Sequence, residues 1–236
     1  MNSVGLENIG VEALVSGKAP EWAKWRVPVI VNIAGDTVDE YGKMAARLDG
    51  VAGVSGIEVN ISCPNIRKGG MQFGTDPLSA AEVTSAVRGS TSLPVIVKLS
   101  PNVTDIAAIA VAVESAGADA VSLINTISGM AVDVKRRKPC LGNITGGLSG
   151  PAIKPIALAM VWKVAGCVGI PVIGCGGIMS AQDALEFIMA GATAVEVGTA
   201  NLVNPQTALD IIDGLQQFMQ AEGIDNIAQL RGAARL

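Results

Sequence analysis

A short polar run, Asn60-Ile61-Ser62-Cys63-Pro64-Asn65, holds the side chain of this sequence that is best suited to chemistry. A lone cysteine is commonly a small buried hydrophobe, and we interpret Cys167 in that way. Cys63 differs because its neighbours are polar and because Gly69 and Gly70 follow closely, as in a loop. A thiol in such a place can ionise, and the thiolate can then act as a base. We therefore predict that Cys63 is the catalytic residue.

The complete lack of histidine narrows the possible chemistry. It excludes a Ser-His-Asp triad, a histidine-ligated metal and a histidine base. Proton transfer is left to a cysteine, a lysine, a carboxylate or the single tyrosine, Tyr41. The four cysteines show no Cys-x-x-Cys spacing, so we expect no bound metal or iron–sulfur cluster on this chain. The same pattern favours a reducing, cytoplasmic location.

The composition favours an apolar core built without many aromatic residues. Of the 236 residues, 50% are hydrophobic, 16% are charged and only 3% are aromatic, which is typical of buried parallel strands covered by helices. The net charge is −4 and no long basic block occurs, so we expect no nucleic-acid partner. No apolar run approaches the about 20 residues that span a membrane, and the first ten residues lack a signal peptide pattern.

Strand and helix patterns alternate along the chain. Runs rich in β-branched residues predict strands at residues 28–34, 56–62, 94–100, 120–125, 171–175 and 194–198. Helical patterns follow them at residues 36–48, 77–88, 102–116, 151–167, 181–190 and 205–221, and a glycine-rich segment covers residues 126–150. We expect Thr75 or Asp76 to cap the second helix, with Pro77 in its first turn, and Asn102 or Thr104 to cap the third. This alternation demands a parallel sheet with right-handed crossovers. No break in composition divides residues 1–236, so we predict one domain.

Glycine turns near the end of the chain favour a barrel over an open sheet. A dinucleotide-binding fold needs G-x-G-x-x-G after its first strand, and the sequence has no such run there. The run Gly174-Cys175-Gly176-Gly177, followed by Gly198-Thr199, instead resembles the phosphate site of the last two loops of a TIM barrel. These glycines could also form simple tight turns, but two such turns after consecutive strands favour the phosphate site. We predict an α/β fold, a TIM (β/α)8 barrel with about six of its eight strands.

Polar residues end four successive predicted strands, namely Asn32, Asn60, Lys98 and Asn125 with Thr126. A single asparagine could be a turn cap, but polar residues at four strand ends favour a shared pocket. Asparagine both donates and accepts hydrogen bonds, so it can recognise the imide edge of a flavin or a pyrimidine. A lysine in such a pocket can stabilise negative charge that develops on the ring.

Three motifs resemble the catalytic subunit of dihydroorotate dehydrogenase. They are N-I-S-C-P-N, G-G-M-Q-F-G-T-D-P and N-I-T-G-G-L-S-G-P-A-I-K-P. The resemblance covers essentially the whole chain and is greatest to the NAD-linked class 1B. It implies an FMN-binding TIM barrel that oxidises (S)-dihydroorotate to orotate in de novo pyrimidine (UMP) biosynthesis.

The resemblance also implies roles for individual residues. Cys63 is expected to remove the proton from C5 of dihydroorotate while hydride passes from C6 to FMN. The quinone-linked relatives use serine as the base, so Cys63 argues against that branch. The expected substrate-binding residues are Asn2, Ser3, Val4, Gly5, Leu6, Asn60, Asn65, Asn125 and Thr126. The expected FMN-binding residues are Asn32, Asn60, Lys98, Ile124, Gly150, Gly176, Gly177, Gly198 and Thr199, with the phosphate on the last four.

The family further implies a homodimer and an electron-transfer subunit that carries FAD and a [2Fe–2S] cluster, together a heterotetramer that reduces NAD⁺. Two alternatives stay open. The first is pyrimidine reduction of the dihydropyrimidine dehydrogenase type. The second follows from the start of the chain at the substrate loop, which leads us to expect that two barrel strands are lacking. An inactive truncated barrel could bind only a phosphorylated ligand or its partner chain.

Overall fold

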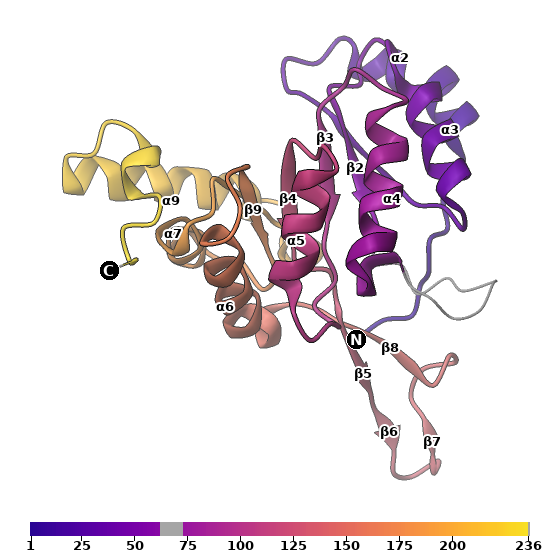
Figure 1. Ribbon diagram of the computed structural model, residues 1–236. Coiled ribbons are helices and arrows are strands. Elements are labelled where there is room, and N and C mark those ends of the chain that lie inside the picture. Colours follow the sequence, from indigo (N-terminus) through magenta and orange to yellow (C-terminus); the bar gives the residue numbers. More distant parts are fainter. Residues whose placement is uncertain (62–72, 236) are drawn as a thin grey trace. The chain divides into compact units, whose positions relative to one another are not determined.

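The computed structural model of the protein describes residues 1–61 and 73–235 (Figure 1). The chain forms two compact units, which we describe separately. The N-unit comprises Leu6–Val121, and the C-unit comprises Met1–Gly5 with Ser122–Leu236. The prediction of a single domain stays a prediction.

The N-unit is built on parallel strands followed by helices. The strands β1 (Ile30–Ile33), β2 (Gly56–Asn60) and β3 (Val95–Lys98) pair in parallel in that order, and β4 (Ala120–Leu123) begins in this unit. Each of the first three is followed by a helix, namely α3 (Val38–Leu48), α4 (Pro77–Arg88) and α5 (Ile106–Ser115). In Figure 1 these three helices run alongside the strands.

The strands of the N-unit have one apolar and one partly polar face. Ile57 and Val59 of β2 and Val95 and Val97 of β3 are completely buried. Because side chains alternate along a strand, the residues between them, such as Glu58, point to the opposite face. The alternation of side chains along each strand therefore places apolar residues on the core face and polar groups on the opposite face.

Helix caps in the N-unit confirm one sequence-based expectation and correct another. Asp76 caps α4 by accepting a hydrogen bond of 2.8 Å from the Ser79 backbone, with Pro77 in the first turn as predicted. Helix α5 begins later than expected. Its cap is Asp105, whose carboxylate accepts from the Ala107 backbone at 3.0 Å, and not Asn102 or Thr104. A carboxylate at this place also complements the positive end of the helix dipole.

Short helices that were not predicted precede β1. They are α1 (Val11–Ala13), the π-helix η1 (Leu14–Lys18) and α2 (Ala19–Trp22). Glu12 and Arg47 join this segment to α3 through two hydrogen bonds of 2.8 Å. Gly53 lies at φ 92°, and a Cβ there would come within 2.4 Å of the Ala19 carbonyl oxygen, so only glycine fits this approach.

The C-unit continues the same pattern. The end of β4 lies beside β9 (Val172–Cys175), which pairs in parallel with β10 (Ala194–Glu196). Its α-helices are α6 (Lys154–Ala165), α7 (Ala181–Ala190), α8 (Thr199–Val203) and α9 (Thr207–Glu222). Its 3-10 turns are η3 (Pro151–Ile153) and η4 (Ile227–Leu230), whereas η2 (Phe73–Thr75) belongs to the N-unit.

The glycine-rich segment of residues 126–150 holds strands that the sequence does not predict. β5 (Ile127–Met130) pairs antiparallel with β8 (Thr145–Leu148), and β6 (Val132–Asp133) pairs antiparallel with β7 (Lys138–Pro139). In Figure 1 they form a narrow extension that ends in a turn. Asp133 stabilises this turn by accepting two backbone hydrogen bonds of 2.9 Å from Lys135 and Arg136.

The helices of the C-unit are held by one aromatic residue and one arginine. Phe187 of α7 is completely buried, and a Cβ at Gly174 of β9 would lie only 2.5 Å from its ring. Arg235 donates hydrogen bonds to the carbonyl oxygens of Trp162 at 2.6 Å and Ala190 at 2.9 Å, and its guanidinium lies 4.6 Å from the centre of the Trp162 ring. This residue ties the last described residues to α6 and α7.

Among the described residues, six strands of the main sheet alternate with helices, which confirms the predicted α/β class and strand count. The interpretation of Cys167 as a buried hydrophobe is wrong, because α6 ends at Ala165 and Cys167 lies exposed just after it. In the same residues no helix is both long and apolar enough to cross a membrane.

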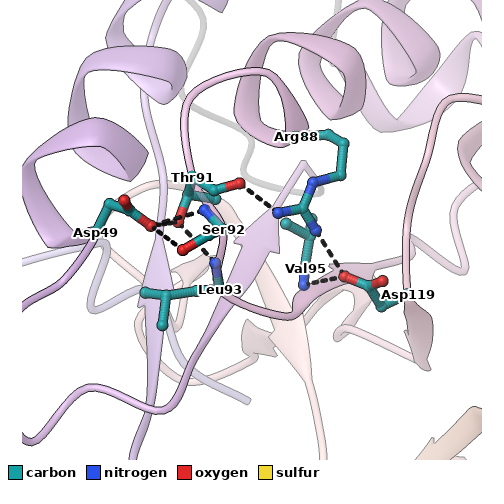
Figure 2. Close-up of polar contacts among 7 residues, drawn as sticks. All are labelled: Asp49, Arg88, Thr91, Ser92, Leu93, Val95 and Asp119. Carbon is teal, nitrogen blue, oxygen red and sulfur yellow. Dashed lines mark hydrogen bonds and ion pairs between the residues drawn. The ribbon is translucent and has the colours of Figure 1, made fainter.

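Polar contacts tie together the amino ends of β3 and β4 (Figure 2). Asp49 accepts hydrogen bonds from the Thr91 hydroxyl and the Ser92 backbone, both at 2.7 Å. Arg88 donates to the Thr91 carbonyl and, at 2.8 Å, to Asp119, which also accepts from the Val95 backbone at 2.7 Å. These contacts fix the loops that enter the two strands.

We predict that Asp49→Asn lowers the melting temperature at pH 7 by about 3 °C. The hydrogen bond from Thr91, with those from Ser92, holds the pKa of the Asp49 carboxyl below its usual value. A depressed pKa in the folded state stabilises the fold above the unfolded pKa of about 3.9 and ceases to do so as the pH falls through the folded value. The difference between parent and variant should therefore shrink below about pH 4 in thermal unfolding experiments.

Asp225→Asn provides the control, because Asp225 is exposed and lies outside these contacts. A loss of stability in Asp49→Asn that persists unchanged at pH 3 would contradict the charge-based explanation.

Candidate functional site

The carboxyl ends of β1, β2 and β3 bring three predicted site residues onto neighbouring strands. Asn60 pairs with Lys98 in the register of β2 and β3, and Asn32 pairs with Glu58 in the register of β1 and β2. Residues paired in register share a face, and residues two apart on one strand do so as well. Asn32, Glu58, Asn60 and Lys98 therefore lie on one face of the N-unit sheet.

Glu58 is a member of this cluster that the sequence analysis missed. Its carboxylate accepts a short hydrogen bond from the Asn32 amide, and the same oxygen lies 3.6 Å from the Lys98 ammonium nitrogen. The signal in the sequence was a single charged residue inside an otherwise apolar strand pattern, two residues before a predicted site residue. A charged side chain in a buried strand requires a partner, because desolvation of an isolated charge is costly.

Asn60 is buried at the end of β2, with an exposed fraction of 8%. Its backbone carbonyl accepts a hydrogen bond of 2.8 Å from the hydroxyl of Tyr41 on α3. The ring of Tyr41 also packs edge-on against Phe73, with 5.9 Å between the ring centres. Helix α3 thus holds the strand end immediately before the predicted catalytic segment. Cys63 and Asn65 themselves lie outside the described residues.

A second group of predicted residues lies together in the C-unit, around the ends of β4 and β9. A Cβ at Gly176 would approach Ile124 to 3.4 Å, and one at Gly177 would come within 2.9 Å of the Gly150 carbonyl oxygen. A Cβ at Gly150 would approach the Thr199 methyl group to 3.4 Å. These five residues, which come from four separate segments, are therefore neighbours.

Backbone geometry explains why three of them are glycine. Gly150, Gly176 and Gly177 have φ values of 82°, 131° and 77°, which L side chains rarely adopt. Such turns expose backbone N–H groups at strand ends and allow an anionic group to approach closely. Beside them, the Thr199 hydroxyl donates to the Ser149 hydroxyl at 2.9 Å at the start of α8.

Gly198, Asn125 and Thr126 complete the predicted residues of this region. Gly198 is exposed, and a Cβ there would meet no atom within 4 Å, so space is open beside it. The Asn125 side-chain oxygen accepts a hydrogen bond of 2.8 Å from the Thr126 backbone. Both residues are half-buried just after β4, while Ile124 is buried and its backbone donates to the Cys175 carbonyl at 2.7 Å.

The predicted substrate loop at the start of the chain is only partly fixed to the C-unit. Asn2 forms a two-hydrogen-bond bridge with Gly147 of β8, at 3.0 and 2.8 Å. Val4 has an exposed fraction of 76%, and Gly5 has φ 85°. Ser3 is half-buried and Leu6 is exposed. Asn2 therefore joins this loop to β8 through backbone hydrogen bonds.

An ion-pair network supports the glycine turn after β9. Lys154 contacts Asp183 at 2.6 Å and Glu186 at 2.9 Å, and its backbone lies against Gly177. Burial raises the pKa of the Asp183 carboxyl, but hydrogen bonds from Lys154, Met179 and Ser180 outweigh it and leave the pKa below its usual value. The hydrogen bonds to Asp183 and Glu186 raise the pKa of the Lys154 ammonium. The network keeps α6 and α7 aligned beneath the turn.

No cluster of three or more acidic, cysteine or histidine side chains suited to a metal ion occurs within residues 1–61 and 73–235. The predicted strand-end residues of the N-unit offer amides and the Lys98 ammonium beside Glu58, and the C-unit offers glycine turns. Such groups suit an organic ligand with a hydrogen-bonding ring and a phosphate.

Comparisons with known proteins identify a family. The family model of dihydroorotate dehydrogenase matches residues 1–219. The chain is 60% identical over 236 residues to the "Dihydroorotate dehydrogenase B (NAD(+)), catalytic subunit" of Desulforamulus reducens. The aligned residues make up 100% of this chain and 78% of that protein. The chain is 59% identical over 234 residues to the protein of the same name from Desulforudis audaxviator, covering 99% and 76% of the two chains.

The fold and the strand-end residues define an α/β protein with the ligand-binding face of a barrel enzyme. The chain belongs to the dihydroorotate dehydrogenase family, a family of oxidoreductases, and within it to the NAD-linked class 1B. This confirms the resemblance, and the observed strands and helices are consistent with the TIM-type barrel of that family.

We predict that Gly177→Ala destabilises the protein by about 1–3 kcal/mol. The methyl group would force a residue with φ 77° into strain and would come within 2.8 Å of the Lys154 backbone nitrogen. Chemical denaturation measures the change. Gly142→Ala is the matched control in the same unit, because its added methyl group would meet nothing within 4 Å. Equal stability of the two variants would contradict the close approach of Gly177 to the Lys154 backbone.

Proposed function

We propose that this chain is the catalytic subunit of an NAD-linked dihydroorotate dehydrogenase, which oxidises (S)-dihydroorotate to orotate in de novo pyrimidine biosynthesis. The observation that carries the proposal is the family match over residues 1–219, together with 60% identity to a catalytic subunit of that name. The polar strand ends of the N-unit and the glycine turns of the C-unit support it.

The described residues fit FMN as the cofactor. FMN has a ring with an imide edge and a phosphate, and the two groups of site residues match these parts. Asn32, Asn60 and Lys98 offer amides and a positive charge at neighbouring strand ends. Gly176 and Gly177 form a turn without side chains after β9, and Thr199 follows the open space at Gly198, an arrangement that suits a phosphate.

We therefore propose that these residues hold FMN, with Ile124 and Gly150 in contact with it. Asn125 and Thr126 are proposed to hold the orotate ring together with Asn60, Asn65 and the loop of residues 2–6. Lys98 places a positive charge at the end of β3, where it can stabilise negative charge on a reduced ring. Bound FMN would supply the acceptor for the hydride that leaves C6 of the substrate.

The proton step is proposed for Cys63. Its thiolate would take the proton from C5, and the loss of that proton and of hydride from C6 leaves the C5=C6 double bond of orotate. No histidine is present in the chain. The hydroxyl of Tyr41 is buried and donates to the Asn60 carbonyl, so it is committed to structure. Both facts support a cysteine in this role.

The name "catalytic subunit" that the relatives carry points to a partner subunit. We propose that the partner is an electron-transfer subunit with FAD and a [2Fe–2S] cluster that passes electrons to NAD⁺, and that two catalytic subunits pair in a heterotetramer. We also propose that the enzyme works in the cytoplasm.

We predict that the purified chain binds added FMN and turns yellow, and that it oxidises dihydroorotate in preference to dihydrouracil. Absorbance near 450 nm after desalting reports the bound flavin, and an artificial acceptor dye reports turnover with each substrate. A protein that stays colourless and inactive would contradict the proposal. Faster turnover of dihydrouracil would instead favour the dihydropyrimidine dehydrogenase alternative.

We predict that Cys63→Ser slows dihydroorotate oxidation about a hundredfold or more, because a hydroxyl is a far weaker base than a thiolate at neutral pH. Flavin binding should not change, so the defect should appear in kcat. Cys140→Ser is the matched control, since Cys140 is an exposed free cysteine outside the predicted site. Full activity in Cys63→Ser would remove Cys63 from the proposed role.

A further inference from the structure

Glu58 is a charged residue in the middle of a strand that is buried throughout its length. Only 7% of this residue is exposed, and Ile57 and Val59 on either side are completely buried. Carboxylates are rarely buried in this way unless a partner compensates their charge. The family match does not by itself explain why a carboxylate stands here.

The contacts of Glu58 point toward Lys98. Asn32 on β1 donates its amide hydrogen to one carboxylate oxygen of Glu58, and Asn32 is the direct register partner of Glu58. The Lys98 ammonium nitrogen on β3 lies 3.6 Å from that same oxygen. The exposed fractions of the Lys98 and Glu58 side chains are 16% and 10%, so little water screens this pair.

We propose that Glu58 is a positioning residue that holds the Lys98 ammonium at the carboxyl end of β3, with Asn32 anchoring the Glu58 carboxylate. This inference rests on the proposed function, in which Lys98 faces the flavin. Lysine has a long flexible side chain and a point charge, so its effect on a ligand depends on where the ammonium is held. A carboxylate fixed on the neighbouring strand restricts that position.

A double-mutant cycle separates positioning from simple electrostatics. Fixed charges act on a bound ring additively, so the direct effect of the Glu58 charge is the same whether or not Lys98 is present. A departure from additivity arises if Glu58 changes where the Lys98 ammonium lies, or if either group changes its charge when the other is replaced. Glu58→Asp keeps a carboxylate at this position and so separates the two cases. A purely structural role for Glu58 would weaken oxidised and reduced FMN alike.

The experiment measures the affinities for oxidised and reduced FMN in the parent, Glu58→Gln, Lys98→Met and the double variant. Fluorescence quenching gives the first affinity, and the midpoint potential of the bound flavin gives the ratio of the two. We expect Lys98→Met to lower the preference for reduced FMN about tenfold in the parent. In the Glu58→Gln background the same change should lower it by only about threefold or less.

Two further variants serve as controls. Glu82→Gln makes the same chemical change on the exposed surface of α4, and Lys98→Met should keep its full effect in that background. Glu58→Asp keeps the charge but shortens the side chain, so it tests the role of position if Glu58→Gln does not fold. Thermal unfolding without flavin gives a second reading of the coupling, because the double variant should lose less stability than the sum of the single variants.

The outcomes distinguish the inference from the proposed function. Non-additive effects on the FMN preference that also occur with Glu58→Asp support Glu58 as the positioning residue, whereas non-additivity with Glu58→Gln alone would contradict it. If FMN binds and the effects of Glu58→Gln and Lys98→Met simply add, the inference is wrong while the proposed function stands. If the parent chain neither binds FMN nor oxidises dihydroorotate, the proposed function fails and this inference fails with it.

Discussion

The in-register parallel pairing of β1, β2 and β3 is the constraint on which the N-unit depends. Side chains alternate along each strand, so the register decides which side chains enter the hydrophobic core and which lie on the opposite face. In this register Ile57 and Val97 enter the core, while Asn32, Glu58, Asn60 and Lys98 meet on the other face. A slip of one residue in any strand would turn its polar groups toward the hydrophobic core and its core residues toward the opposite face.

The amino and carboxyl ends of these strands differ in the kind of contacts that they make. At the amino ends, Asp49, Arg88 and Asp119 tie the loops together with contacts that stabilise the fold (Figure 2). At the carboxyl ends, amides and charges lie where a barrel enzyme binds its ligands. In the C-unit, glycine turns after β9 keep side chains away from the carboxyl end of that strand. The contacts that stabilise the loops are thus separate from the residues of the predicted site.

Much of this arrangement could be predicted from the sequence, because the β-branched runs and the cap at Asp76 are local signals. Glu58 was missed because its meaning depends on Asn32 and Lys98, which lie on other strands. The start of α5 at Asp105 was missed because several preceding residues could cap a helix equally well. The strands of residues 127–148 were missed because their pairing runs through short, glycine-rich segments with little β-propensity. The resemblance supplied the predicted catalytic and cofactor-binding roles, and all of these roles stay predictions. Cys63 and Asn65 also lie outside the described residues.

The hydrogen bond from Tyr41 to the Asn60 carbonyl has a practical consequence, because Tyr41 is the single tyrosine of the chain. Replacement of tyrosine by fluorotyrosine would introduce one fluorine label into the whole protein. That label would lie in the core, against Phe73 and next to the strand end that precedes Cys63. A single ¹⁹F resonance would then report on the strand end that precedes the predicted catalytic residue, without assignment of any other signal.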